Sequence, residues 1–146
     1  MLVHERLADE VFATACMVTI APDRRSACVR VAGHPLPVLV AGGIARELPG
    51  PPSRPPLGVG AGTDQWPEVP VTLPAGWQLL LYTDGLIEGR VGDGPDRLGS
   101  LRLAELVAEG APEPGARLIE RLIATAERFN GGDLADDVAV LVLAGP

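Results

Sequence analysis

The sequence WQLLLYTDG, from Trp77 to Gly85, decides the fold of this chain. An apolar run with an aromatic residue at each end, too short for an independent helix and stopped by Asp-Gly, is typical of a buried β-strand. Asp84 would therefore emerge from the edge of a sheet on rigid backbone, and Gly85 would let another group approach the main chain closely. Such a place suits a metal ion or a phosphate group.

A second acidic cluster lies much later, in GGDLADD at residues 131–137. Three like charges within five residues, Asp133, Asp136 and Asp137, repel one another, and a bound cation would ease their packing. Oxygen ligands of this kind suit a hard divalent ion. In extended backbone Asp136 and Asp137 point to opposite sides, so only one of them can join Asp84 around an ion. The other would orient a ligand or contact solvent.

Each acidic signal has a plainer alternative when it is taken alone. An aspartate after a strand, such as Asp84, is commonly a helix N-cap or a turn former. The pair Asp136-Asp137 could equally be the solvated end of a loop.

The basic residues near these segments also allow two interpretations. His34 could donate a proton near neutral pH, although a single loop histidine is more often structural. Arg90, Arg97 and Arg102 could meet a phosphate group, although solvated surface arginines are the commoner case.

Composition narrows the class of protein. A chain of 146 residues, 47% of them hydrophobic, can bury one core and is too short for two comfortable domains. A formal net charge of -7 argues against binding to the phosphate backbone of nucleic acid. Cys16 and Cys28 lie in alternating apolar contexts that favour buried thiols, with a disulfide across a hairpin left open.

The N-terminus does not resemble a secretion signal, and no apolar run is long enough to span a membrane. We therefore expect a cytoplasmic protein without a nucleic-acid or membrane partner.

Turn residues and periodicity divide the chain into short strands followed by two helices. Met1–Glu10 resembles the end of a helix, and Phe12–Ala32 predicts a hairpin. The proline-rich stretch Pro49–Pro56 predicts a surface loop. One helix is expected to be introduced by Ser100 and closed by Gly110, and another to run from about Glu113 to Phe129. The remaining strands are expected at Val38–Val40, Ile44–Leu48, Val69–Leu73, Trp77–Tyr82 and Val138–Leu143.

With these residues in view, the chain resembles the metal-dependent 2C-type protein serine/threonine phosphatases, and among them the bacterial SpoIIE/RsbU-like branch. The resemblance implies an α+β fold, an αββα four-layer sandwich of two antiparallel sheets flanked by helices. It also implies two Mn²⁺ or Mg²⁺ ions held by aspartates at the sheet ends. Five segments carry it in matching order and spacing: FATA at 12–15, AGHP at 32–35, PLGV at 56–59, LYTDGLIE at 81–88 and DDVAVLV at 136–142.

Carried over residue by residue, the resemblance makes Asp84 and Asp136 the catalytic residues. It makes Asp84, Gly85 and Asp136 the metal site, with Asp137 and His34 next to the ligands. Two ions held in this way can activate a shared water and neutralise the phosphoryl oxygens during in-line attack.

The resemblance covers the C-terminal portion of the family's domain. Family members carry, ahead of the segment that matches Phe12, strands with a Gly-Asp motif whose aspartate bridges both ions, followed by a helix pair. Residues 1–146 are therefore expected to form a single partial domain without those strands and helices. The activity of this chain alone is left open by the missing bridging ligand, and uncovered sheet edges would favour a homo-oligomer.

The function implied by the resemblance is hydrolysis of a phosphoserine or phosphothreonine protein, such as a phosphorylated anti-sigma-factor antagonist, in bacterial stress or developmental signalling. The alternative is a catalytically inactive remnant that acts as a protein-binding regulatory module.

Overall fold

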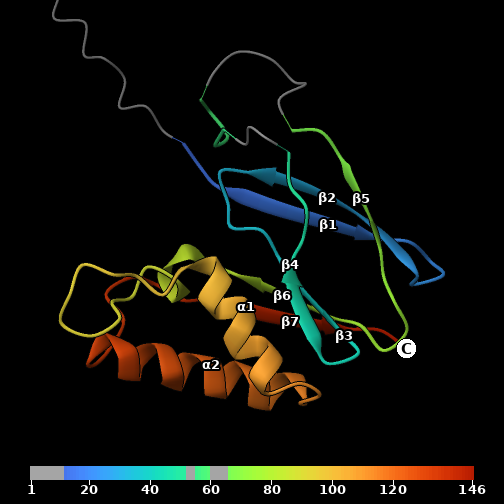
Figure 1. The fold of residues 1–146 in the computed structure, drawn as a ribbon. Helices are drawn as coiled ribbons and strands as arrows, with labels where there is room; N and C mark the ends of the chain where they lie inside the picture. The colour runs from blue at the N-terminus through green and yellow to red at the C-terminus, as the bar shows by residue number, and fades with distance from the viewer. Residues whose placement is uncertain (1–11, 52–54, 60–65) are drawn as a thin grey trace, which may run out of the picture.

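The computed structural model describes residues 12–51, 55–59 and 66–146, in which the strands form two antiparallel sheets (Figure 1). The predicted helix end at Met1–Glu10 lies outside the described residues. One sheet has the order β1-β2-β5 and the other has the order β4-β3-β6-β7. The strands are β1 (Ala15–Ile20), β2 (Ser26–Ala32), β3 (Val38–Ala41), β4 (Ile44–Glu47), β5 (Val69–Thr72), β6 (Gln78–Tyr82) and β7 (Val140–Ala144).

The predicted hairpin is present in the three-stranded sheet, where β1 pairs with β2 over its whole length. Its turn is held by the amide of Ala21, which donates to the carbonyl oxygen of Ser26 at 2.9 Å, and by the side chain of Asp23, which accepts from the amide of Arg25. The first strand begins at Ala15 rather than Phe12, whose side chain is 62% exposed. Residue Ala13 forms only an isolated bridge with Leu57, so regular pairing with β2 starts at Ala15 and the predicted boundary is too early.

The two cysteines are free and half-buried rather than fully buried. Cys16 lies opposite Val31, whereas Cys28 lies opposite Thr19. Because only directly opposed positions bring Cβ atoms within bridging distance, this register rules out a hairpin disulfide between them. Burial raises the pKa of the Cys16 thiol.

Strand β6 is the centre of the four-stranded sheet, between β3 and β7. Leu80 and Tyr82 belong to a core beneath the helices, whereas Leu79 belongs to a second core between the two sheets. Successive residues point to opposite faces, so burial on both faces explains why the sequence here is continuously apolar rather than alternating. Each leucine buried in this way contributes about 1.5–3 kcal/mol.

Helices α1 (Gly99–Glu109) and α2 (Gly115–Asn130) lie together over one face of the four-stranded sheet, and the three-stranded sheet lies on its other side (Figure 1). The described residues thus stack in three layers, helices, sheet and sheet, and the predicted α+β class is confirmed. None of their helices combines the length and the apolar character that a membrane span requires.

The helix ends differ slightly from the prediction. Ser100 lies inside the first turn of α1 rather than capping it, because Leu98 occupies the cap position and makes no side-chain bond there. Helix α2 begins after Pro114, which lies at its cap position. It ends as expected near Phe129, where Gly131 adopts a φ of 78° and its amide donates to the carbonyl oxygen of Arg128.

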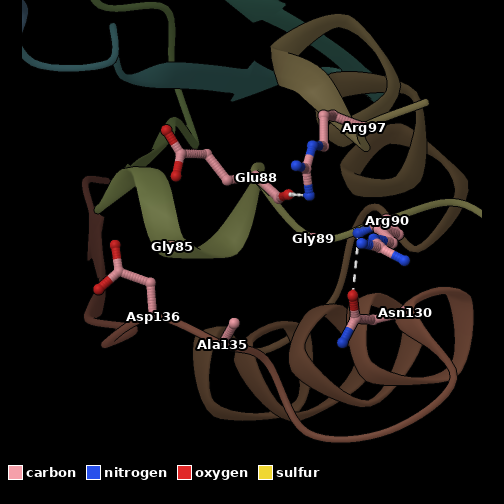
Figure 2. A pocket seen from close by; sticks show the side chains of 8 residues that line it. All are labelled: Gly85, Glu88, Gly89, Arg90, Arg97, Asn130, Ala135 and Asp136. Atoms are coloured by element: carbon pink, nitrogen blue, oxygen red, sulfur yellow. Dashed lines mark hydrogen bonds between the residues drawn. The ribbon is translucent and has the colours of Figure 1, made fainter. Parts of the chain in front are cut away.

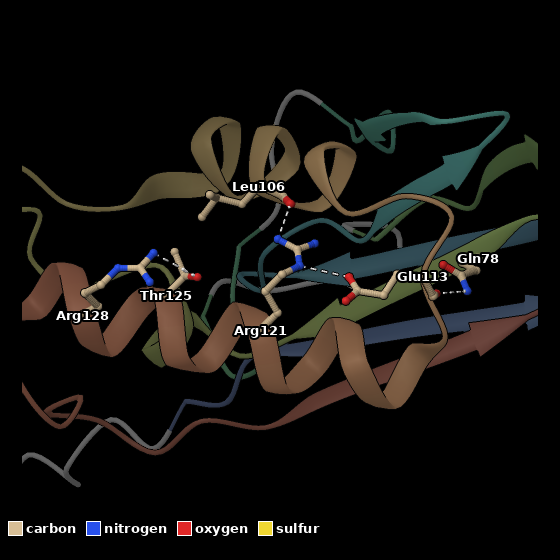
Figure 3. Close-up of polar contacts among 6 residues, drawn as sticks. All are labelled: Gln78, Leu106, Glu113, Arg121, Thr125 and Arg128. Carbon is tan, nitrogen blue, oxygen red and sulfur yellow. Dashed lines mark hydrogen bonds and ion pairs between the residues drawn. The ribbon is translucent and has the colours of Figure 1, made fainter.

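Polar contacts attach the segment that connects α1 and α2 to the sheet (Figure 3). The Nε atom of Arg121 on α2 donates to Oε2 of Glu113 at 3.0 Å, and its Nη1 atom donates to the carbonyl oxygen of Leu106 on α1 at 2.8 Å. The side-chain amide of Gln78 on β6 donates to the carbonyl oxygen of Glu113. These bonds join α1, α2 and β6, and so hold the helices in place over the strand that ends at the candidate site.

Candidate functional site

Thr83 joins the end of β6 to the segment that precedes β7. Its amide donates to the carbonyl oxygen of Ala139 at 3.0 Å, and its hydroxyl oxygen accepts from the amide of Ala139 at 2.9 Å. The same hydroxyl donates to the carbonyl oxygen of Asp137 at 3.2 Å. Three hydrogen bonds on one residue therefore bring Asp84 and Asp136, far apart in the sequence, to the same edge of the sheet.

Gly85 lies where the two segments approach most closely. It is the central residue of a short 3₁₀ helix, η1 (Asp84–Leu86), and is buried. A Cβ atom at this position would overlap the carbonyl oxygen of Asp137 and lie 3.3 Å from that of Asp136. The close main-chain approach expected at this glycine is therefore present, and any side chain would push the 136–137 segment away.

Asp84 is neither a helix N-cap nor buried. Thr83 occupies the cap position of η1, and the carbonyl oxygen of Asp84 accepts the amides of Ile87 and Glu88, both at 2.9 Å. Its exposed carboxylate forms no hydrogen bond or ion pair with the described residues. It lines a hollow of about 560 Å³ together with His34 and Glu88, so it is available to a ligand.

Asp136 lines a second hollow, of about 720 Å³, together with Gly85 and Glu88 (Figure 2). The carboxylate of Asp136 accepts the amide of Asp137 at 2.8 Å, which fixes its orientation on an exposed loop. Asp137 contributes its main chain, because its carbonyl oxygen holds Thr83. Its exposed side chain forms no bond to Asp84 or Asp136.

Glu88 is the residue that sequence reasoning missed, and it lines both hollows. It lies in the segment LYTDGLIE, and its amide bonds to the carbonyl oxygen of Asp84. A carboxylate four residues after another on a helical turn lies on the same side of that turn, and this spacing was the available signal. Glu88 therefore adds a carboxylate to the hollow that contains Asp84 and to the hollow that contains Asp136.

His34 connects the loop after β2 to the end of β6. Its Nε2 atom lies 3.0 Å from the carbonyl oxygen of Tyr82, and its Nδ1 atom lies 3.2 Å from the hydroxyl of Thr14. Because a carbonyl oxygen can only accept, Nε2 carries a proton and donates it to the carbonyl oxygen of Tyr82, while Nδ1 forms the hydrogen bond with the hydroxyl of Thr14. Both nitrogens are therefore engaged, and the histidine holds the backbone next to Asp84.

The donor set of this edge suits a hard cation but does not complete a metal centre. Asp84 and Asp136 are carboxylates, the ligands that Mg²⁺ and Mn²⁺ prefer, and one or two carboxylates with water commonly hold Mg²⁺. In the part of the chain that the structure describes, no group of three or more His, Cys, Asp or Glu side chains is arranged to hold a metal ion. The carboxylates of this edge are thus of the type that a hydrated divalent ion prefers, while the described residues supply no complete ligand set.

Comparisons with known proteins bear on the family and the fold of the chain. The family model described as Stage II sporulation protein E (SpoIIE) matches residues 1–145. A search of curated proteins finds no match.

Solved structures with the same fold include the SiaA-PP2C domain of Pseudomonas aeruginosa, at 25% identity and a TM-score of 0.76. The match covers 91% of this chain and 52% of that one. The RsbU and RsbW domains of Rv1364c from Mycobacterium tuberculosis share 35% identity at a TM-score of 0.67, over 88% of this chain and 36% of that one.

The catalytic domain of the serine/threonine protein phosphatase PstP, in complex with two manganese ions, has the same fold at 20% identity and a TM-score of 0.60, over 90% of this chain and 57% of that one. The chain thus spans between 36% and 57% of these three neighbours. Its fold, its sheet-edge carboxylates and the match over residues 1–145 lead to one conclusion: the chain belongs to the SpoIIE family, a branch of the PP2C-type phosphatase domains.

Proposed function

We propose that this chain is part of a metal-dependent protein serine/threonine phosphatase, which hydrolyses a phosphoric monoester on a phosphoserine or phosphothreonine protein. One observation carries the proposal. The three hydrogen bonds of Thr83 hold the ends of β6 and β7 together, so that Asp84 and Asp136 flank Gly85 at one sheet edge.

Asp84 and Asp136 would hold Mn²⁺ or Mg²⁺, with Gly85 between them. A cation of this kind, when bound, supplies Lewis acidity and an activated water near neutral pH. The chain's own residues provide the fixed geometry. Asp84 begins η1 two residues after the end of β6, and the amide of Asp137 orients the carboxylate of Asp136. The manganese-bound PstP domain with the same fold supports this choice of metal.

His34 and Asp137 act through the backbone in this proposal. His34 holds the carbonyl oxygen of Tyr82, two residues before Asp84, and Asp137 holds the hydroxyl of Thr83. Each bond restricts the movement of one carboxylate-bearing segment. Neither side chain needs to exchange a proton with the substrate.

The substrate would be a small phosphoprotein, such as a phosphorylated anti-sigma-factor antagonist in the cytoplasm, and dephosphorylation would act in stress or developmental signalling. The neighbour from Mycobacterium tuberculosis supports a protein partner, because its structure contains RsbU and RsbW domains. The net charge of -7 favours a protein over nucleic acid.

A second function follows from a specific observation. The described residues present no three-ligand metal group, so this chain could serve as a binding module that recognises a phosphoprotein without hydrolysing it.

Release of phosphate from a phosphoserine peptide, measured at high protein concentration with and without Mn²⁺, separates the two functions. A phosphatase would give slow release that requires Mn²⁺ and is abolished in Asp84→Asn and Asp136→Asn, which remove ligand charge at nearly constant shape. Asp93→Asn is the matched control, because it removes the same charge from an exposed loop residue that lines neither hollow. Absence of Mn²⁺-dependent release from the unmodified chain would favour the binding module.

A further inference from the structure

The loop between η1 and α1 is held firmly by its own backbone. The amide of Gly99 donates to the carbonyl oxygen of Ile87, and the amide of Leu98 donates to that of Gly89, both at 3.0 Å. Two more bonds fix the loop to the end of α2: the amide of Gly92 donates to the carbonyl oxygen of Phe129, and the amide of Arg90 donates to the side-chain oxygen of Asn130. These four hydrogen bonds therefore fix the position of the loop backbone relative to η1 and α2.

Arg90 and Arg97 form an antiparallel bridge across this loop, and both line the 720 Å³ hollow that contains Asp136. Directly opposed residues of an antiparallel pair carry their side chains on the same face. In Figure 2 the two arginines lie at one side of the hollow, whereas Asp136 and the carboxylate of Glu88 lie at the other. The backbone thus places two arginine side chains on the same side of one hollow, which also contains Asp136 of the proposed catalytic edge.

This arrangement is unfavourable for the free protein. Like charges directly opposite each other in a strand pair destabilise it. The ion pairs in the described part of the chain are Arg30–Glu68 and Arg121–Glu113, so neither loop arginine has a carboxylate partner there. Arg97 donates one Nη1 hydrogen bond to the carbonyl oxygen of Glu88, which leaves the rest of its fork open. An anion bound between the two guanidinium groups would relieve the repulsion and accept charge-assisted hydrogen bonds.

We propose that Arg90 and Arg97 bind an acidic side chain that flanks the phosphorylated residue of the substrate protein, and so select acidic sequences. This inference rests on the proposed phosphatase function. We assign the phosphoryl group to the opposite side of the hollow, beside Asp136 and Glu88, where a bound cation would offset the negative charge of the carboxylates and let it approach. The ligand of the two arginines is then a flanking carboxylate rather than the phosphoryl group. A volume of about 720 Å³ also leaves room for a second side chain beside the phosphorylated one.

The test compares two labelled phosphoserine peptides that differ only in the flanking positions, glutamate in one and glutamine in the other. Binding to the complete chain is followed by fluorescence anisotropy in the presence of Mn²⁺. The double substitution Arg90→Gln/Arg97→Gln is expected to weaken binding of the glutamate peptide by roughly tenfold or more, since charge-assisted hydrogen bonds are lost. The affinity for the glutamine peptide should change by less than about twofold, because its flanking side chain is uncharged.

Arg25→Gln/Arg117→Gln is the matched control, because it removes the same two charges from exposed residues that do not line the hollow. Arg90→Lys/Arg97→Lys keeps the charge but loses the planar fork, and should bind the glutamate peptide with intermediate affinity. Unfolding midpoints of all variants exclude a loss of folding as the cause.

Phosphate release from the same peptides and from a small aryl phosphate separates failure of this inference from failure of the proposed function. Arginine-dependent binding without Mn²⁺-dependent release would support the arginine pair and reject the phosphatase. Mn²⁺-dependent release that is unaffected by the arginine substitutions would support the phosphatase and reject the arginine pair. Equal losses on both peptides and on the aryl phosphate would assign the arginines to the phosphoryl group, and failure of the chain to bind either peptide would also overturn the inference.

Discussion

The hydroxyl of Thr83 donates a hydrogen bond to the carbonyl oxygen of Asp137 at 3.2 Å and so joins the end of β6 to the acidic loop before β7. The same oxygen accepts the amide of Ala139. One small side chain thus satisfies two main-chain groups of another segment. The proposed site depends on this connection more directly than on any contact between carboxylates.

Replacing Thr83 by valine removes the hydroxyl at nearly constant volume. We expect a loss of about 1 kcal/mol in the free energy of unfolding for each hydrogen bond, because water can partly replace the protein partners at this half-buried position. Mn²⁺ binding should weaken as well, since Asp84 and Asp136 lose their fixed separation. Urea unfolding and titration with Mn²⁺ measure the two effects. Thr83→Ser keeps the hydroxyl and should behave like the unmodified chain; equal behaviour of the valine variant would contradict this account.

Gly85→Ala should distort the site. The new Cβ atom would overlap the carbonyl oxygen of Asp137, and forcing an atom into such a contact costs about 1–3 kcal/mol. Gly94→Ala is the control, because it introduces the same atom in the neighbouring loop with no heavy atom within 4 Å. Thermal unfolding of both variants provides the comparison. A Gly85→Ala variant as stable as the Gly94→Ala variant would show that the two segments can separate freely.

Mn²⁺ binding should be weak and should require both sheet-edge aspartates. Affinity for hard cations follows the number of charged oxygen ligands, and no three-ligand group is present in the described ranges. Asp84→Asn or Asp136→Asn should therefore weaken binding by about tenfold or more, whereas Asp93→Asn should leave it unchanged. Electron paramagnetic resonance of free Mn²⁺ measures the affinity. Tight binding that survives either substitution would place the cation elsewhere on the chain.

His34 should act through its hydrogen bond to the carbonyl oxygen of Tyr82 rather than through proton transfer. A glutamine at position 34 offers an amide N–H in place of the Nε2–H donor but cannot titrate near neutral pH. His34→Gln should therefore retain most stability and most Mn²⁺-dependent phosphate release, whereas His34→Ala should lose part of both. A His34→Gln variant that is stable but fully inactive would assign the histidine a role in proton transfer.

Arg121→Met should lower stability without changing the sheet edge. The pair with Glu113 is only partly exposed, at 29% for the arginine side chain and 18% for the glutamate side chain. Its loss should therefore fall between about 1 kcal/mol, typical of surface pairs, and about 3–5 kcal/mol, typical of a broken buried pair. Arg117→Met, at an exposed position of the same helix, is the control. Equal denaturation midpoints for the two variants would refute a structural role for the pair.

The strand pattern could be predicted from the sequence because local signals agree with the tertiary environment there. The alternation before and after Ala21-Pro22-Asp23 matches a hairpin, and the apolar run up to Tyr82 matches a strand buried on both faces. Boundaries were less accurate where tertiary contacts override local preference. Phe12 precedes β1, whose pairing with β2 starts at Ala15, and Leu98 occupies the N-cap position that was expected for Ser100.

The sequence by itself singled out Asp84, Gly85 and Asp136 as candidate site residues, through the order and spacing of five segments taken together rather than through any one local pattern. It also determined the family, because the match extends over residues 1–145. Only the tertiary structure decided that Glu88 lines both hollows and that Arg90 faces the same hollow as Asp136. These relationships depend on the hydrogen bonds of Thr83 and on the packing of the helices against β6. Contacts between segments distant in the chain follow from the free energy of the whole fold, so no local pattern specifies them.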